Sequence, residues 1–417
     1  MKSIRKFSLL LIVGVIMMSV AGCAAASAAD LMDGVSPNRV SERRVDTAFA
    51  NSMSNFSIEL FKESITDREN SLISPLSVAL ALAMTANGAA NETLVQMEKL
   101  LGGDIPLAEL NEYLHTFAKG LPNAEKSKLH IANSIWVRDN KDRLQVKPDF
   151  LQRNADYYDA SAYKSAFDSQ TVNDINKWVK SNTDGMIDKI LNTIDESHIM
   201  YLINAVAFDA EWQDIYKESA ISNGEFTDIN GANQNVDFMH SIENKYLDDG
   251  RAIGFIKPYA DGYSFAALLP NEGISIEEYI KSLSGGGFLS IIKSSQEAEV
   301  IASLPKFEYE YEIKLNEALK ILGIPDAFDK GKADFSKMAD LPGDNIFIDE
   351  VLHKSFITVD ERGTKAGAVT MVALFDKSSP IDGPKSVRLD RPFVYAIIDN
   401  MTSLPVFIGT VMKAGSK

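Results

Sequence analysis

The spacing of hydrophobic residues at the start of the chain is typical of helices. Apolar residues recur every three or four positions, which predicts an amphipathic first helix. These residues are Phe49, Met53, Phe56 and Leu60. Segment 70–88 is apolar on nearly every side and contains Ser74-Pro75, a favourable helix start, so we expect a buried helix there. Helical spacing between 175 and 191 predicts another helix.

Strand-like patterns dominate the later part of the chain. Segments 129–137 and 200–208 are largely apolar and uncharged, as expected of buried central strands. Further strand-rich regions are 252–269, 299–309, 346–359 and 391–411. We find no repeats and no long linker after Val45. The pattern therefore predicts one large α+β domain with a mixed sheet.

One segment fits neither a permanent loop nor a permanent helix. After Lys365 come ten uncharged residues, from Ala366 to Phe375, that combine small side chains with β-formers. In a strand, Thr364 would share one face with the even-numbered residues that follow it, and that face would carry no charge. Lys365 would lie on the other face. An ordinary buried strand is the simpler interpretation, but the loop-like surroundings favour a segment that alternates between exposed loop and buried strand.

The first 22 residues have the pattern of a signal peptide. Three cations precede an apolar stretch that ends at Val20-Ala21-Gly22-Cys23, a sequence similar to a bacterial lipobox. Cys23 is the only cysteine of the chain, and we expect it to carry lipid. The alternative is cleavage near Ala29, with Cys23 discarded. Residues 23–44 are mostly small and polar, so they are predicted to form a lipidated, flexible tether to a domain at 45–417.

Composition and motifs give no support to an enzyme. The formal net charge is −16 without a basic tract, which argues against duplex nucleic-acid binding. None of the five histidines lies in a paired metal-binding spacing, and no GxSxG, P-loop or GxGxxG motif is present. Gly285-Gly286-Gly287 is interpreted as a turn. We expect no metal and no cofactor.

Several segments, in order, resemble the serpin family of protease inhibitors between about Val45 and Lys413. The matching segments are NSLISPLS at 70–77, Asn204 with Phe208 and Trp212, VLHK at 351–354, TVDERGT at 358–364 and VRLDRPFVYAI at 387–397. The resemblance implies helices around a large mixed central sheet, two further sheets and an exposed reactive-centre loop at about 361–386.

The resemblance also implies roles for buried polar residues. Ser74, Ser77, Asn204 and His353 would form the shutter, a hydrogen-bonded cluster under the part of the sheet that opens. Trp212 would lie at the breach, where the loop first enters. These residues are equally compatible with an ordinary hydrogen-bonded core.

In this family the cleaved loop inserts into the sheet and traps the acylated protease, and the hinge of the loop needs small side chains. The matching hinge residues are Glu361, Gly363, Thr364, Ala366, Gly367, Ala368 and Thr370. These side chains favour an inhibitor over a non-inhibitory binding or chaperone protein of the same family. Val369 is bulkier than the usual alanine, which would slow insertion.

The usual hinge length, counted from Glu361, places the scissile bond at Lys377-Ser378, which implies a trypsin-like serine protease as partner. The adjacent acidic residue, Asp376, disfavours cleavage of this bond by many such proteases. Alternative bonds are Phe375-Asp376, which would suit a chymotrypsin-like protease, Lys385-Ser386 and Arg388-Leu389. The expected state is a monomer, with polymerisation by loop-into-sheet pairing on heating.

Overall fold

The computed structural model describes residues 27–66, 68–139, 143–364 and 383–414. Its α-helices are α1 (Thr47–Glu63), α2 (Pro75–Ala86), α3 (Asn91–Gly102), α4 (Leu107–Gly120), α5 (Pro148–Tyr158), α6 (Ser169–Asn182), α7 (Ile276–Ser282), α8 (Gly285–Lys293) and α9 (Asn316–Ile321). Short 3₁₀ helices span Glu218–Ala220 and Pro325–Phe328.

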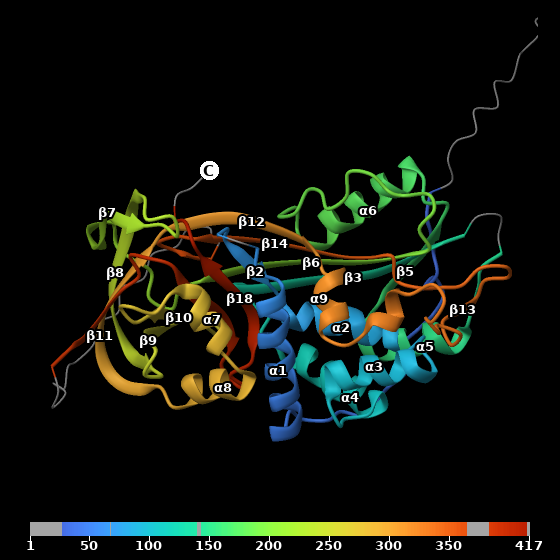
Figure 1. Ribbon diagram of the computed structural model, residues 1–417, viewed down its shortest axis with the longest axis horizontal. Helices are drawn as coiled ribbons and strands as arrows, with labels where there is room; N and C mark the ends of the chain where they lie inside the picture. The colour runs from blue at the N-terminus through green and yellow to red at the C-terminus, as the bar shows by residue number, and fades with distance from the viewer. Residues whose placement is uncertain (1–26, 67, 140–142, 365–382, 415–417) are drawn as a thin grey trace, which may run out of the picture.

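A seven-stranded mixed sheet runs along the length of the molecule (Figure 1). Its strands, in spatial order, are β1 (Ala29–Asp30), β5 (Ser161–Ser165), β3 (Ser127–Arg138), β6 (Met200–Glu211), β15 (Gly363–Thr364), β14 (Glu350–Val359) and β12 (Phe307–Lys314). The β3–β6 and β12–β14 ladders are antiparallel, whereas β6 and β14 pair in parallel. A parallel pair in mid-sheet needs no tight turn between its strands, so the two can separate without breaking a hairpin.

A nine-stranded sheet packs beneath one end of the first sheet. Its main path is β16 (Lys385–Arg388), β11 (Gln296–Pro305), β8 (Asn233–Asp248), β9 (Ala252–Pro258), β10 (Tyr263–Pro270), β17 (Phe393–Asp399), β18 (Pro405–Val411) and β2 (Ser71–Ile73), with β7 (Ile221–Thr227) paired to β8. The strands β4 (Gln145–Val146) and β13 (Ala339–Asp340) form a third, two-stranded sheet. The predicted α+β class and the three sheets are confirmed.

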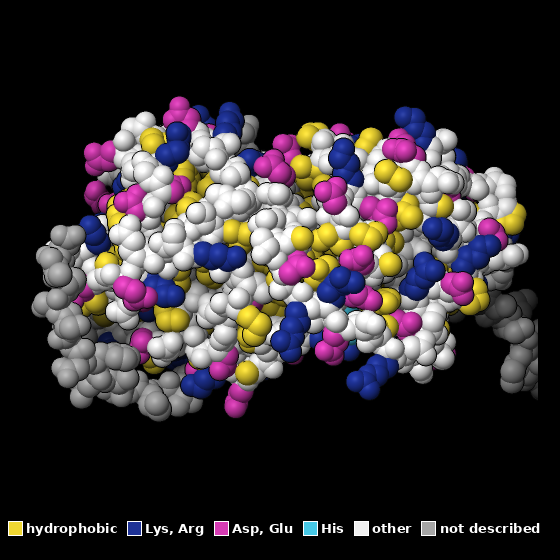
Figure 2. All heavy atoms as spheres, turned by 90° about the horizontal axis from the view of Figure 1, so that it is seen from below, with side chains coloured by type: hydrophobic (Ala, Val, Ile, Leu, Met, Phe, Trp, Pro, Cys, Tyr) yellow, Lys and Arg dark blue, Asp and Glu magenta, His cyan; other side chains and the backbone are white. Residues whose placement is uncertain are grey.

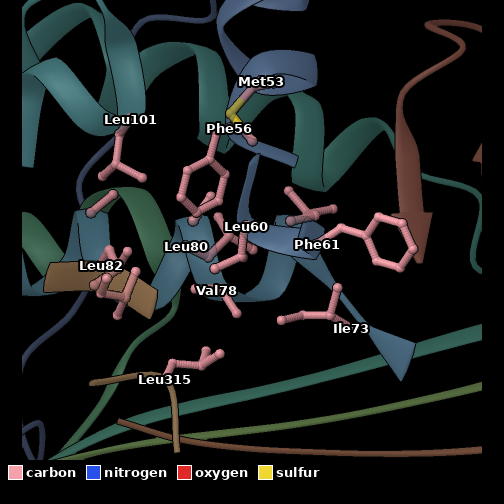
Figure 3. Packing of buried hydrophobic residues seen from close by; sticks show 14 of the residues in the cluster. Met53, Phe56, Leu60, Phe61, Ile73, Val78, Leu80, Leu82, Leu101 and Leu315 are labelled. Carbon is pink, nitrogen blue, oxygen red and sulfur yellow. The ribbon is translucent and has the colours of Figure 1, made fainter. Parts of the chain in front are cut away.

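Helices cover both faces of the seven-stranded sheet. Helix α6 lies on one face, and α1 to α5 cluster on the other (Figure 1). Helix α2 contacts both β3 and β6, and it is buried along its whole length because α1, α3 and the sheet surround it. The predicted apolar positions of α1 belong to one buried cluster with residues of α2 and with Ile73. Figure 3 shows Met53, Phe56 and Leu60 of this cluster. Ser74 begins α2, since its side chain accepts a hydrogen bond from the Ser77 backbone N–H while Pro75 needs no such partner.

Two local predictions are wrong. The helix expected between 175 and 191 ends at Asn182; Ile187, Ile190 and Leu191 are buried beside it from an irregular segment. Burial alone explains their apolar character. The three glycines at 285–287 do not form a turn but the first residues of α8, which Ser284 caps. Gly285 is needed because a Cβ there would lie 2.4 Å from the Asn55 backbone nitrogen of α1.

The described part of the expected tether, residues 27–44, lies against the domain. Strand β1 extends the sheet beside β5, and the Leu31 N–H donates to the Ala162 carbonyl oxygen at 2.8 Å. Further along, the Asn38 N–H donates to Asp156 at 2.7 Å, and Arg43 pairs with Glu112 at 3.0 Å. This segment therefore follows the domain surface through backbone hydrogen bonds at β1 and through polar side-chain contacts further along, which its composition does not reveal.

No helix among the described residues is long and apolar enough to span a bilayer. On the face shown in Figure 2, acidic and basic side chains lie among one another, with hydrophobic side chains between them.

Candidate functional site

The centre of the seven-stranded sheet holds a partly occupied slot between β6 and β14. The two strands pair directly from Glu350–Tyr201 to Phe356–Ala207. Beyond this stretch β15 lies between them, antiparallel to both, with Thr364 opposite Ala210 on one side and Val359 on the other. The first residues of the predicted hinge thus already occupy the end of the slot.

The fit of the hinge into the slot depends on small side chains. A Cβ on Gly363 would lie 1.9 Å from the Ala210 carbonyl oxygen, so only glycine allows this approach. Thr364 is fully buried, and its hydroxyl lies 2.6 Å from the Tyr259 hydroxyl. Its face of the strand points inward, as the alternation of side chains predicts.

Replacing Gly363 by alanine is expected to expel β15 from the slot. The clash is with backbone, which cannot move aside as a side chain can, so the free energy of unfolding should fall by about 1–3 kcal/mol. Guanidinium unfolding measures this. Gly383→Ala is the matched control, because a Cβ at that loop position meets nothing within 4 Å. Equal midpoints for the two variants would contradict the steric argument.

A tight turn connects β14 to the hinge. The Asp360 carboxylate accepts hydrogen bonds from the backbone N–H groups of Arg362 at 2.8 Å and Gly363 at 3.2 Å. Glu361 pairs with Lys306 at 2.7 Å, and this hydrogen bond lowers the pKa of the Glu361 carboxyl. The turn sets the direction in which the hinge leaves β14.

Trp212, the residue predicted at the breach, follows β6 directly and contacts this turn. Its indole N–H donates to the Asp360 carbonyl oxygen at 2.9 Å, and its backbone N–H donates to the Arg362 carbonyl oxygen at 2.8 Å. The ring stacks on Tyr259 with centroids 4.4 Å apart. Trp212 therefore contacts the turn that precedes the hinge, and Tyr259 contacts Thr364 of the hinge itself.

A buried ion pair lies beside Trp212, with the Lys257 ammonium 5.4 Å from the centre of the indole ring, and the sequence analysis missed it. Lys257 and Glu243 lie 3.0 Å apart with side chains only 3% and 7% exposed. The Lys257 ammonium lies 4.3 Å from the centre of the Tyr216 ring. Burial works against the charged ammonium, but Tyr216 and Glu243 outweigh it and raise the pKa of Lys257. A lysine inside the apolar segment 252–258 was the available signal.

The structure brings together the four residues predicted for the shutter. Ser74 and Ser77 lie at the start of α2, directly beneath Asn204 of β6 and His353 of β14. The Ser74 N–H donates to His353 Nε2 at 3.4 Å, so Nδ1 carries the proton and donates to Asn204 Oδ1. Asn204 Nδ2 donates in turn to Ser77 Oγ. One continuous network thus links the two strands that flank the slot to α2.

Asn133 extends this network, and Ser355 adds a separate hydrogen bond nearby. Asn133 of β3 accepts hydrogen bonds from Ser77 Oγ at 3.2 Å and from Asn204, and it donates to the Ser77 carbonyl oxygen at 3.0 Å. Ser355 of β14 donates to the Leu72 carbonyl oxygen at 2.7 Å. A lone asparagine in the apolar segment 129–137 was the only sequence signal for Asn133.

The shutter histidine is fully buried, and burial lowers the pKa of His353 to about 3. An unfolded chain binds a proton at this imidazole below about pH 6.5, whereas the folded protein stays neutral until near pH 3. The free energy of unfolding therefore falls as pH falls through this window, by about 1.4 kcal/mol per pH unit. Protonation would also remove the acceptor that the Ser74 N–H needs.

Between pH 7 and pH 5 we expect His353 to contribute about 2 kcal/mol to the loss of stability. Replacement by glutamine, which does not titrate, should reduce the difference between the unfolding free energies at the two pH values by that amount. Denaturant unfolding of both proteins at both pH values tests this. An unchanged pH dependence in His353→Gln would show that this imidazole is not the titrating group.

The remaining predicted residues lie outside the described part of the chain. These are Cys23, the hinge residues Ala366, Gly367, Ala368 and Thr370, and the bond Lys377-Ser378. Within the described residues, no group of three or more histidine, cysteine or acidic side chains is placed to hold a metal ion.

Comparison with known proteins identifies the class. The profile of the serpin (serine protease inhibitor) family matches residues 51–414. The chain belongs to the serpin family. An uncharacterized serpin-like protein of Thermococcus kodakarensis is 30% identical over 376 residues, covering 87% of this chain and 85% of its own. Barley Serpin-Z7 is 30% identical and covers 82% of this chain and 89% of its own.

Among solved structures, the thermophilic serpin tengpin is 58% identical in its native state, with a TM-score of 0.89, covering 93% of this chain and 100% of tengpin. In its latent state the TM-score is 0.80, at 57% identity and with 90% and 100% of the two chains covered. A loop C-sheet serpin polymer matches with a TM-score of 0.79 at 57% identity, covering 91% of this chain and 100% of that one. The arrangement described above is thus more similar to the native than to the latent state of tengpin.

Proposed function

We propose that this protein is a suicide-substrate inhibitor of a trypsin-like serine endopeptidase, cleaved at Lys377-Ser378. The single observation that carries the proposal is β15: Gly363 and Thr364 pair with β6, and Thr364 also pairs with β14, at the end of a slot that continues between these two strands. A protease that attacks the loop becomes acylated on Lys377, and insertion of the released hinge then displaces it before water completes hydrolysis.

In the proposed insertion, the rest of the hinge continues in the register of β15. Thr364 lies opposite Ala210 and Val359, so six residues further along an antiparallel strand Thr370 reaches Asn204 and His353. Insertion therefore replaces the direct hydrogen bond between these two shutter residues. The side chains that enter the inner face on the way are Ala366 and Ala368, which are small enough to pass.

The energy balance favours insertion. Ten inserted residues bring about ten N–H and ten C=O groups into ladders, whereas opening the slot breaks about seven hydrogen bonds between β6 and β14. At roughly 1 kcal/mol per hydrogen bond, the net gain is on the order of 10 kcal/mol before apolar burial is counted. An inserted strand of about twelve residues is also roughly 40 Å long, so insertion moves the acylated protease far from the position where it first bound the loop.

The test is to mix trypsin with the chain from residue 24 onward, which retains every described residue. We expect a covalent complex that survives denaturant and a released peptide that begins at Ser378 by mass spectrometry. Lys377→Gln, which removes the residue trypsin recognises, should form no complex with trypsin. Cleavage after Lys377 without a complex would contradict inhibition of trypsin, and an uncut loop would favour a non-inhibitory binding role.

The same assay with chymotrypsin decides the alternative bond. A complex with chymotrypsin, together with a peptide beginning at Asp376, would assign the target to the chymotrypsin-like class through Phe375.

We also propose that lipid on Cys23 holds the protein at the outer face of a bacterial membrane, because the lone cysteine ends a lipobox-like sequence. Expression with the full signal sequence should place the protein in the membrane fraction, and Cys23→Ser should release it. Equal partitioning of both proteins would contradict the anchor.

A further inference from the structure

A hydrogen-bonded clip joins β6 and β14 at the end of the slot that lies far from the hinge. Asp349 directly precedes β14, and its carboxylate oxygen Oδ2 accepts hydrogen bonds from the backbone N–H groups of Ile199 at 2.5 Å and Met200 at 3.0 Å. The Asp349 backbone N–H donates to the Met200 carbonyl oxygen at 3.0 Å. Three hydrogen bonds therefore hold Asp349 to the start of β6.

Neighbouring elements support the clip from both sides. The Asn316 side chain, at the start of α9, donates to the Asp349 carbonyl oxygen at 2.5 Å and accepts from the Val351 N–H at 3.0 Å. On the other side, the Ile199 carbonyl oxygen accepts from the Arg138 N–H of β3 at 2.8 Å. Both residues that donate to the carboxylate are buried. Loss of the carboxylate would therefore leave two buried N–H groups without an acceptor.

The clip occupies hydrogen-bonding groups that an inserted hinge would need. Thr364 lies opposite Ala210, so in the same antiparallel register Leu374 would come opposite Met200. The N–H and C=O groups of Met200 both bond to Asp349. A strand that enters from the breach can therefore fill most of the slot while the clip is closed, but it pairs with Met200 only after the hydrogen bonds to Asp349 break.

We propose that Asp349 is a positioning residue that controls the last stage of hinge insertion. While the clip is closed, insertion halts before the cut end of the hinge is inside the sheet. Once the clip opens, the remaining residues enter, and the acylated protease moves to the far end of the sheet. This role rests on the insertion mechanism proposed above, because it takes its register from β15.

Synthetic peptides that copy the hinge separate this role from a general loss of stability. In the register of β15 the long peptide, residues 365–375 (KAGAVTMVALF), reaches the clip, whereas the short peptide, residues 365–372 (KAGAVTMV), ends before it. Native gels follow the uptake of each fluorescently labelled peptide by the chain from residue 24 onward, without a protease. We expect Asp349→Ala to take up the long peptide at least about tenfold faster than the parent protein, because two hydrogen bonds no longer have to break, and the short peptide at an unchanged rate.

Three further variants control the experiment. Asp349→Asn keeps an acceptor oxygen and should behave as the parent protein does. Asp344→Ala is the matched control, because this nearby carboxylate pairs with Arg138 and Lys330 instead of with β6, and it should leave both rates unchanged. Asn316→Ala loosens the clip from α9 and should also speed uptake of the long peptide, which tests the role even if Asp349→Ala fails to fold.

The outcomes separate the clip from the insertion mechanism. Faster uptake of the long peptide alone by Asp349→Ala or Asn316→Ala, with the parent rate in Asp349→Asn, would support the role of Asp349. Equal changes for both peptides, or no change for either, would overturn it and leave insertion standing. If neither peptide enters any of the proteins, the slot does not accept the hinge, and both proposals fail.

Discussion

Replacing Thr364 by arginine is expected to convert the protein from an inhibitor of trypsin into a substrate. Thr364 has no exposed surface, and its hydroxyl is held by Tyr259 within the slot. An arginine at this position would bury a charge without a partner, at a cost of several kcal/mol. Because each 1.4 kcal/mol changes a ratio tenfold, hydrolysis of the acyl-enzyme should overtake insertion by well over tenfold.

The stoichiometry of inhibition measures this competition directly. We expect close to one inhibitor consumed per trypsin for the parent protein and more than about ten for Thr364→Arg. Thr364→Glu gives the same burial penalty without a new trypsin site, and Thr364→Ser is the conservative control. Gly383→Glu places a charge in the loop beyond the scissile bond and should have no effect. Full inhibition by both charged Thr364 variants would refute loop insertion.

Cutting the loop alone should make the protein far more stable, without any trapped protease. A metalloprotease such as thermolysin attacks through an activated water and forms no acyl-enzyme, so it releases the hinge freely. Insertion should then raise the free energy of unfolding by on the order of 10 kcal/mol, which is comparable to the whole stability of an ordinary domain. For a chain of this size the thermal midpoint should rise by about 10–15 °C.

Calorimetry of cut and intact protein tests this expectation, with the cut site established by mass spectrometry. The cut Thr364→Arg variant is the control, because its hinge carries the unpaired charge and should gain little. A cut parent protein that melts at the same temperature as the intact one would show that the slot between β6 and β14 does not accept the hinge.

Elements with a strong local pattern could be predicted from the sequence. The apolar spacing of α1 and the Ser-Pro start of α2 are local signals, and the long uncharged runs of β3 and β6 are sufficient to indicate buried strands. The shutter residues depended on resemblance, because nothing in the spacing of Ser77, Asn204 and His353 says that they meet.

Features that depend on long-range contact could not be predicted. Lys257 and Glu243 meet because neighbouring strands bring them together, and the unusual setting of Lys257 in an apolar segment does not say which acid pairs with it. The need for glycine at 363 arises from the Ala210 carbonyl oxygen, more than 150 residues earlier in the chain. The docking of residues 27–44 begins with backbone pairing of β1 and continues with contacts to Asp156 and Glu112, and composition reveals neither.

Strand β1 has a consequence for how a membrane-bound protein would meet its target. It pairs beside Tyr163 and Lys164, at the end of the sheet where β3 reaches Arg138, whereas Thr364 emerges opposite Ala210 at the end where β3 begins. The 12 residues of β3 separate these ends by roughly 40 Å. If Cys23 carries the proposed lipid, the end of the sheet where Thr364 lies would face away from the membrane, toward soluble proteases rather than toward those embedded in the same bilayer.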